Sequence, residues 1–161
     1  MIVVATIGIV AAVAAPGLLR ARMSGNEAAA ISSLRAINSG QAAFSRSCAA
    51  GGYAATLDDL AKPPTGSSRG FVTGELGTNG ATKSGYLVTL APDGAPGTTA
   101  MSGVATCNSA SAPLASSYFA RADPLAPGGT GLRFFATDTR GGIFYDGATI
   151  ANPITVTTVV E

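Results

Sequence analysis

Residues 1–47 read MIVVATIGIVAAVAAPGLLRARMSGNEAAAISSLRAINSGQAAFSRS, and this stretch decides the fold of the 161-residue chain. No charged side chain occurs in it before Arg20. As a helix, the apolar run that ends at Leu19 would be about 28 Å long, close to the thickness of the hydrocarbon core of a bilayer. Three roles are open to such a run: a cleaved signal peptide, a permanent membrane anchor, or a helix that leaves the membrane and packs against copies of itself.

The sequence after the apolar run argues against a signal peptide. A secretory signal has a basic segment before its apolar stretch and a small-x-small cleavage site after it. Here no basic residue precedes the run, which passes directly into a second helix-forming stretch without proline. Apolar residues recur in that stretch near the 3.6-residue period of a helix, at Ala28, Ile31, Leu34, Ile37 and Phe44, with Gln41 on the same face. We therefore predict one helix of about 70 Å, apolar all round in its first half and amphipathic in its second.

Three residues weaken the first half of this helix. Pro16 lacks a backbone N–H and clashes with the preceding turn, and Gly8 and Gly17 have low helix propensity. The sequence therefore predicts a kink or a locally melted stretch between Gly8 and Gly17, with a second bend at Gly25.

The chain after residue 50 predicts a loop-rich body with an antiparallel sheet. Segments rich in Tyr, Phe, Val or Leu and bounded by turn residues predict strands at residues 85–90, 116–122, 132–137 and 142–145. Residues 138–141 predict a hairpin turn, and residues 154–160 predict either a further strand or a tail. Residues 57–60 predict a single helical turn that is capped by Thr56 and ended by Pro63 and Pro64. A sheet packed on the Ala28 to Phe44 face gives an α+β fold.

The composition bears on function mainly through the residues that it lacks. Only 12% of the residues are charged, the net charge is +1, and there is neither His nor Trp. The chain thus lacks the commonest general base and metal ligand, so we expect no catalytic residue, no enzymatic activity and no cofactor. Nucleic-acid binding has no basic patch to support it. Asp123, Asp138 and Asp146 could bind calcium, but no ordered D-x-D-x-D-G loop is present, so we predict turn roles and no metal site.

The two cysteines, Cys48 and Cys107, lie outside the apolar segment. A disulfide between them would close a loop of roughly 60 residues and stabilise the fold by about 4 kcal/mol. The alternative is two buried thiols, which would suit a reducing compartment. Their spacing does not match a CxxC redox or zinc pair, and we predict the disulfide.

The segment MIVVATIGIVAAVAAPGLLRAR resembles the N-terminal helix of type IV pilins and type II secretion pseudopilins. In that family an apolar run, Gly, further apolar residues, Pro, Leu-Leu and Arg follow in this order. The next residues, NEAAAISSLRAINSGQAAFS, look like the amphipathic continuation of the same helix. Three later segments, TKSGYLVTL, SSYFARADP and GLRFFATDTRGGIFYDG, are similar to the sheet region of a bacterial pilin-like subgroup. The family's mature chain starts with a methylated residue and Thr-Leu-Ile-Glu, which we expect to precede Met1 in the full-length protein.

The resemblance implies a subunit that waits in the inner membrane until an ATP-driven machine extracts it into a helical homopolymer. Its partners would be further copies of itself, the inner membrane, a prepilin peptidase and the assembly ATPase machinery. The stretch from Gly8 to Pro16 would unwind only once neighbouring subunits enclose it, because lipid cannot satisfy exposed amides. Arg20, Arg22 and Glu27 would form ion pairs between subunits or a solvated collar outside the bilayer. The residues implied in the filament core are Ile2, Val3, Val4, Ile7, Gly8, Ile9, Val10, Val13, Pro16, Leu18 and Leu19.

These observations divide the chain into three parts. Residues 1–22 are the apolar helix of the membrane or filament core, residues 23–48 are its amphipathic continuation, and residues 49–161 are a globular head. The main hypothesis is a structural subunit of a surface filament, which is extracellular after assembly. One alternative is a pseudopilin, whose short periplasmic filament pushes substrates through a type II secretion system. The other is a single-span periplasmic binding protein that never polymerises.

Overall fold

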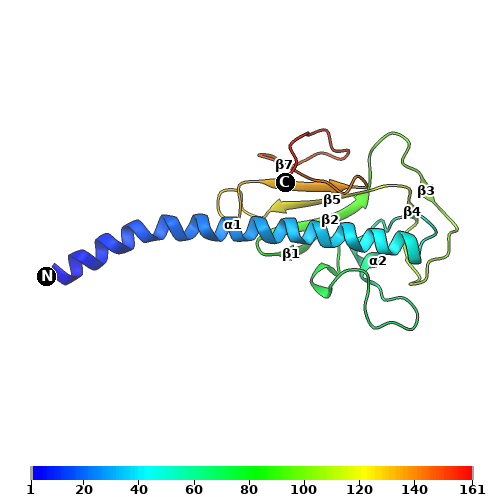
Figure 1. Cartoon of the computed structure of the whole chain (residues 1–161), viewed down its shortest axis with the longest axis horizontal. Helices are drawn as coiled ribbons and strands as arrows, with labels where there is room; N and C mark the ends of the chain where they lie inside the picture. Colours follow the sequence, from blue (N-terminus) through cyan, green and yellow to red (C-terminus); the bar gives the residue numbers. More distant parts are fainter. Residues whose placement is uncertain (1, 161) are drawn as a thin grey trace.

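The computed structural model describes the backbone of residues 2–160 and the side chains of residues 17–160. Helix α1 (Ile2–Ser47) runs without interruption through the stretch from Gly8 to Gly17. The predicted locally melted stretch is therefore absent from the isolated chain, although Figure 1 shows the first half of α1 curving away from the axis of the second half. Proline removes one backbone hydrogen bond, and a helix can respond by bending instead of ending.

The second half of α1 lies along a five-stranded antiparallel sheet in the order β1-β2-β5-β6-β7 (Figure 1). The strands of this sheet are β1 (Ala81–Lys83), β2 (Tyr86–Pro92), β5 (Tyr118–Pro124), β6 (Phe134–Asp138) and β7 (Ile143–Asp146). The remaining elements are α2 (Leu57–Ala61), the 3-10 turn η1 (Gly74–Leu76), and β3 (Ala100–Met101) paired with β4 (Leu114–Ala115). The α+β fold and the four predicted strands are confirmed, with boundaries shifted by a few residues. Strands β1, β3 and β4 were not predicted.

One face of α1 builds the main core against the sheet. Ala30, Leu34, Ile37, Gln41 and Phe44 are buried there, at intervals of three and four residues. The prediction that this face begins at Ala28 is wrong, because Ala28 is exposed and Ile31 is only half-buried. Two residues along a helix turn the side chain by about 200°, so a face centred on residue 30 points residue 28 outward.

The opposite face of the sheet carries a smaller core that the C-terminal segment covers. Phe119, Ala136, Phe144 and Ile150 are buried together, and Ile154 packs against them. At the β7 edge, the Tyr145 N–H donates to the Thr158 carbonyl and the Val160 N–H donates to the Ile143 carbonyl. The predicted strand or tail at residues 154–160 is thus a tail with one bridge to the sheet, between Phe144 and Val159.

A disulfide joins Cys48, just after the end of α1, to Cys107, which confirms the predicted pair. Nearby, the predicted helical turn is present as α2, with the Thr56 hydroxyl accepting a hydrogen bond from the Asp59 N–H. The buried Asp59 carboxylate accepts the N–H groups of Ser111 at 2.7 Å and Ala112 at 2.9 Å. The loop that carries Cys107 is therefore tied both to α1 and to α2.

Candidate assembly surface

Most described side chains of α1 before Asn26 are exposed to solvent. Residues 17–25 are exposed apart from the half-buried Met23. Leu18 and Leu19 are 56% and 58% exposed although both are large and apolar. In Figure 1 this part of α1 extends beyond the sheet and away from the body. The two leucines thus form an apolar surface that the described part of the chain does not cover.

Most of the filament-core residues implied by the sequence lie outside the described side chains. Only Leu18 and Leu19 can be placed, and both are on the protruding part of α1. The others are Ile2, Val3, Val4, Ile7, Gly8, Ile9, Val10, Val13 and Pro16, for which the structure gives the helical backbone alone. Across the described residues, no helix contains a stretch long and apolar enough to cross a membrane.

Where α1 meets the body, two polar side chains fasten it to the loop between β5 and β6. The Asn26 side-chain amide donates to the Thr130 carbonyl at 2.9 Å. One carboxylate oxygen of Glu27 accepts the N–H of Leu132 at 2.9 Å and that of Arg133 at 3.3 Å. Its other oxygen lies 2.8 Å from Nε and 2.7 Å from Nη2 of Arg133. These bonds fix the level on α1 at which the body begins.

The environment of Glu27 keeps its carboxyl ionised. Burial by itself would raise the pKa of this group, but the hydrogen bonds from Leu132 and Arg133 and the positive charge of Arg133 outweigh burial and hold the pKa below its ordinary value of 4.5. Within the chain Glu27 is paired with Arg133, and the contact between subunits predicted for Glu27 stays a prediction. Both carboxylate oxygens bind Arg133 or the backbone beside it within the chain, whereas Arg20 and Arg22 remain exposed on the protruding helix.

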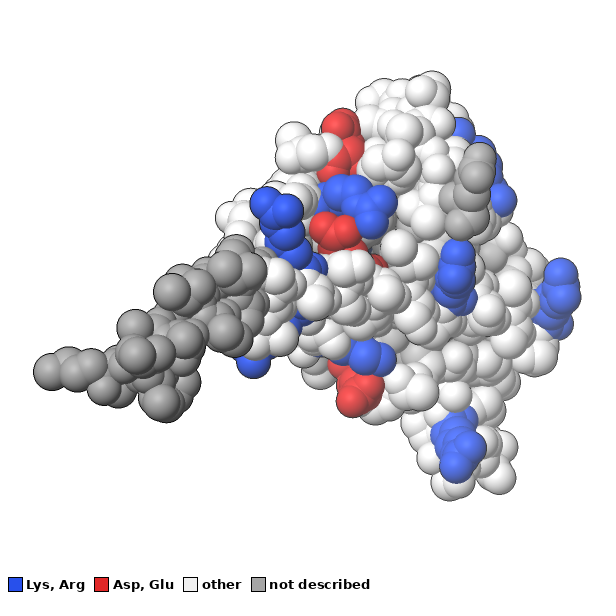
Figure 2. Space-filling view, turned by 60° about the vertical axis from the view of Figure 1, so that its left-hand side comes forward, with Lys and Arg blue, Asp and Glu red and all other residues white. Residues whose placement is uncertain are grey.

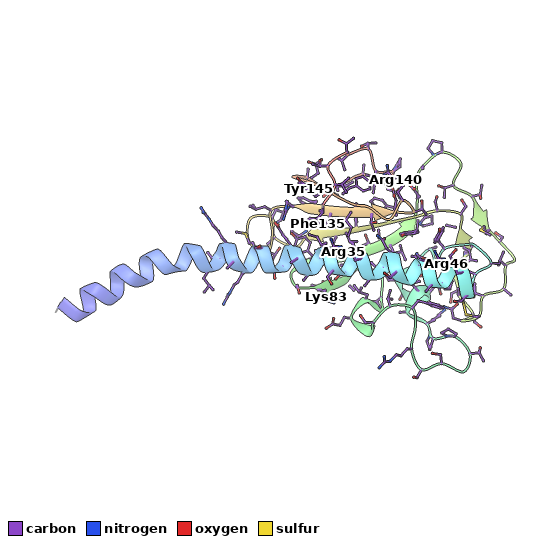
Figure 3. The ribbon with its side chains drawn as sticks, viewed as in Figure 1. Arg35, Arg46, Lys83, Phe135, Arg140 and Tyr145 are labelled. Atoms are coloured by element: carbon purple, nitrogen blue, oxygen red, sulfur yellow. A yellow bond between two sulfur atoms is a disulfide. The ribbon has the colours of Figure 1, made fainter. Side chains whose placement is uncertain are left out.

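Arg133 connects this junction to the aromatic side chains of the sheet. Its guanidinium lies 5.4 Å from the centre of the Phe135 ring and 5.3 Å from that of Tyr145. Figure 3 shows these two rings on neighbouring strands, above α1. The Tyr86 hydroxyl donates to the Arg133 carbonyl at 2.9 Å. Burial, with a further contribution from the charge of Glu27, raises the pKa of Tyr86 to about 12, so this hydroxyl keeps its proton at neutral pH.

A second polar contact holds α1 further along the sheet. The Asn38 side-chain oxygen accepts the hydroxyl groups of Tyr118 at 2.9 Å and Thr137 at 3.0 Å, and its amide donates to the Gly141 carbonyl at 3.0 Å. Burial raises the pKa of Tyr118, which keeps this hydroxyl a donor. Hydrogen bonds therefore hold the amphipathic half of α1 against the head at two places, at Asn26 and Glu27 and again at Asn38.

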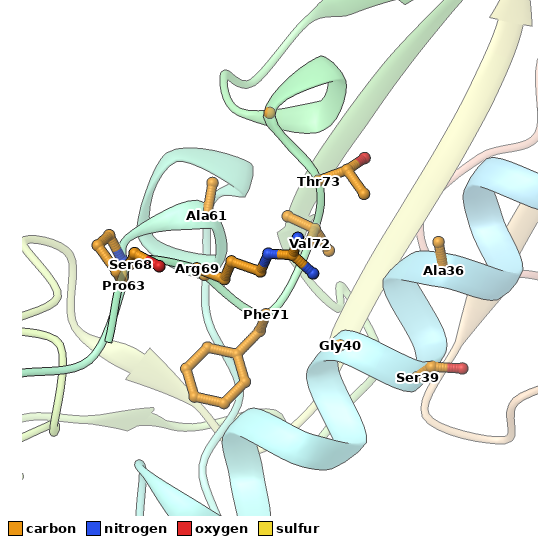
Figure 4. A pocket seen from close by; sticks show the side chains of 12 residues that line it. Ala36, Ser39, Gly40, Ala61, Pro63, Ser68, Arg69, Phe71, Val72 and Thr73 are labelled. Carbon is orange, nitrogen blue, oxygen red and sulfur yellow. The ribbon is translucent and has the colours of Figure 1, made fainter. Parts of the chain in front are cut away.

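An open groove of about 780 Å³ lies between α1 and the segment that follows α2 (Figure 4). Arg69 is the one charged side chain in its lining, where it lies near Phe71 and Val72. Gly40 of α1 also lines the groove and packs closely against Phe71, since a Cβ there would come within 2.7 Å of the Phe71 carbonyl oxygen. The polar side chains of the lining are Arg69 and the hydroxyls of Ser39, Ser68 and Thr73.

The three aspartates considered as calcium ligands have separate roles. Asp138 caps the turn by accepting the Arg140 N–H and forms an ion pair with the Arg140 side chain, which lies over the Phe144 ring. Asp123 pairs with Arg121 at 3.1 Å, and Asp146 is exposed. In the described part of the chain, no three His, Cys, Asp or Glu side chains gather in a way that could hold a metal ion.

Charged groups are sparse on the described surface, and Figure 2 shows them as separate blue and red groups on a largely uncharged face. Four of the described ion pairs lie within the head, and the fifth, between Glu27 and Arg133, lies at its junction with α1. No protein-family model, curated protein or solved structure matches the chain.

Proposed function

We propose that this chain is a structural subunit of a type IV pilus-like extracellular filament, which polymerises through α1. The observation that carries the proposal is the exposed stretch of α1 at residues 17–25, which continues the apolar run of residues 1–19. Such a helix is stable in water only when other apolar surfaces cover it, and identical helices from neighbouring subunits can do so. The resemblance of residues 1–22 to the helix of type IV pilins supports the same role.

The arrangement of the head suits a polymer in which the helix is loaded along its axis. The disulfide at Cys48 closes the end of α1 onto the head, and the contacts of Glu27 fasten α1 where the head begins. A pull on the protruding helix is thereby shared between a covalent bond and a part-buried ion pair. This is the mechanical task of a subunit whose helix sits in a filament core and whose head faces solvent.

The proposal is tested by electron microscopy and mass spectrometry of filaments sheared from cells that produce the chain. We expect filaments composed of this protein, and we expect Leu18→Asp together with Leu19→Asp to abolish them, because two carboxylates cannot be buried between apolar helices. Val159→Asp is the matched control, since Val159 is 47% exposed but lies on the head. Filaments that survive the paired change at Leu18 and Leu19, or that never contain this chain, refute the proposal.

A further inference from the structure

Exposed apolar side chains gather at the end of the head from which α1 emerges. Leu18, Leu19, Leu125 and Leu132 are four of the five large apolar residues that the described surface exposes, and Leu125 and Leu132 are 53% and 60% exposed. Both belong to the segment between β5 and β6. In Figure 1 this segment is the part of the head next to the protruding half of α1.

The hydrogen bonds of this segment fix how far its leucines lie from the apolar run, measured along the axis of α1. The Leu132 N–H donates to Glu27, and the Leu125 N–H donates to the Gly85 carbonyl at 2.9 Å. A Cβ on Gly85 would come within 2.9 Å of Thr130 and 3.5 Å of Asn26, so Leu125 also lies close to this level. Leu132 is thus held beside Glu27, eight residues beyond Leu19, or about 12 Å along the helix axis.

If α1 is inserted in a bilayer up to Leu19, the distance of Leu132 from the hydrocarbon core is comparable with the depth of the headgroup layer. Each headgroup layer is about 5–8 Å deep, and membrane helices tilt by about 20° on average. The sheet lies on one side of α1, offset by about 10 Å, so a tilt toward the sheet lowers this segment by about 3 Å. The remaining separation of about 9 Å lets a leucine side chain reach the outer headgroup layer.

The charges around this end fit an anionic lipid surface. Arg20 and Arg22 are exposed just beyond the apolar run, and neither takes part in an ion pair with another described residue. Arg133 is 43% exposed although it pairs with Glu27. The opposing charges at this end include the exposed Asp146, which lies across from Phe134 in the sheet, and Asp123, which is paired with Arg121. Arginines at this depth place their charge among lipid phosphates while their stems stay in apolar surroundings.

We propose that this end of the head is a lipid-docking surface, on which Leu125 and Leu132 enter the headgroup layer of an anionic bilayer and Arg20 and Arg22 contact the phosphates. The inference rests on the proposed function, in which the subunit is anchored in a membrane before assembly. The occupant is lipid because α1 leads from the apolar run to this end of the head, and in the proposed function that run lies in the bilayer before assembly. Docking holds the head against the membrane until extraction into the filament breaks the contact.

The chain contains no Trp, so a single introduced Trp reports its own depth. The full chain is reconstituted in phosphatidylcholine vesicles with or without phosphatidylglycerol, some of whose lipids carry bromine near the headgroup. In Leu132→Trp and in Leu125→Trp, we expect the brominated lipids to quench most of the Trp fluorescence. We expect acrylamide, a quencher dissolved in the water, to have little effect on it. The control is Ser102→Trp, at an exposed position directly after β3 at the other end of the head. The fluorescence of this control should be quenched by acrylamide and not by the brominated lipids.

The outcomes separate this inference from the proposed function. If the chain co-floats with the vesicles in a density gradient but acrylamide quenches the Trp at 125 and 132 as strongly as in the control, docking is refuted and the filament proposal stands. If the chain does not associate with vesicles, both fail. Shielding that arises only in assembled filaments assigns the surface to a second copy and also overturns docking. We further expect Arg20→Gln with Arg22→Gln to remove the gain in quenching that phosphatidylglycerol produces, and an unchanged gain contradicts the assigned role of these arginines.

Discussion

Replacing Glu27 by alanine tests the junction between α1 and the head. The change removes the acceptor for the N–H groups of Leu132 and Arg133 and the ionic partner of the Arg133 guanidinium. A hydrogen bond to a charged group contributes about 1.5–3 kcal/mol, and part of this is recovered because the half-exposed Arg133 is rehydrated. We expect a loss of about 3 kcal/mol in the free energy of unfolding, which lowers the Tm by about 6–12 °C for a chain of this size.

Glu75→Ala is the matched control. Glu75 pairs with Lys83 at 2.9 Å, so the ionic distance is like that of the Glu27 pair, but its side chain is 72% exposed. An exposed ion pair of this kind contributes less than about 1 kcal/mol. Thermal unfolding of the full chain in detergent, followed by circular dichroism, compares the two variants. Equal losses for Glu27→Ala and Glu75→Ala would refute the argument that burial and the backbone N–H donors of Leu132 and Arg133 make the Glu27 contact important.

The contribution of Glu27 should also depend on pH. Its pKa is lowered in the folded chain, so the interaction stabilises fully above the ordinary value of 4.5 and is lost as the pH falls through the lower folded value. The difference in Tm between the parent and Glu27→Ala should therefore be constant at neutral pH and shrink in acid. A difference that persists unchanged well below the folded pKa would show that packing, and not charge, causes the loss.

Three further predictions concern the head and α1. Replacing Cys48 and Cys107 together by serine should cost about 4 kcal/mol because the disulfide closes a loop of 59 residues, and an unchanged urea midpoint would contradict this. Gly40→Ala should destabilise by about 1–3 kcal/mol because its Cβ would meet the Phe71 carbonyl oxygen. Its control Gly25→Ala has open space around it and should stabilise by about 0.5–1 kcal/mol, so the same sign for both would refute the packing argument. Burial raises the pKa of Asp123, while Arg121 lowers it less, and Oδ1 of Asp123 is buried without a hydrogen-bond partner. Asp123→Asn should therefore raise the Tm at neutral pH and lose this effect below pH 3.8, where the carboxyl is neutral in both states; a lower Tm at neutral pH would contradict it.

Periodicity alone predicted the parts of the fold that depend on local sequence. The spacing of Leu34, Ile37, Gln41 and Phe44 is a property of any helix, so the buried face was predictable without knowing what covers it. The strands rich in Tyr, Phe and Val were predictable for the same reason. The short strand β1 was missed because its residues, Ala81–Lys83, have no apolar alternation and are held in place by pairing with β2.

The sequence by itself determined a long helix with an apolar first half, an antiparallel sheet and two cysteines suited to pairing. Only the tertiary structure decided what Glu27 does, because its partner Arg133 is more than a hundred residues away and the fold brings the two within 2.7 Å. It also placed Leu132 beside Glu27 and Leu125 beside Gly85, at the end of the head from which α1 emerges. Local preferences act over a few residues, whereas a junction or a surface is made by segments that meet only when the chain has folded.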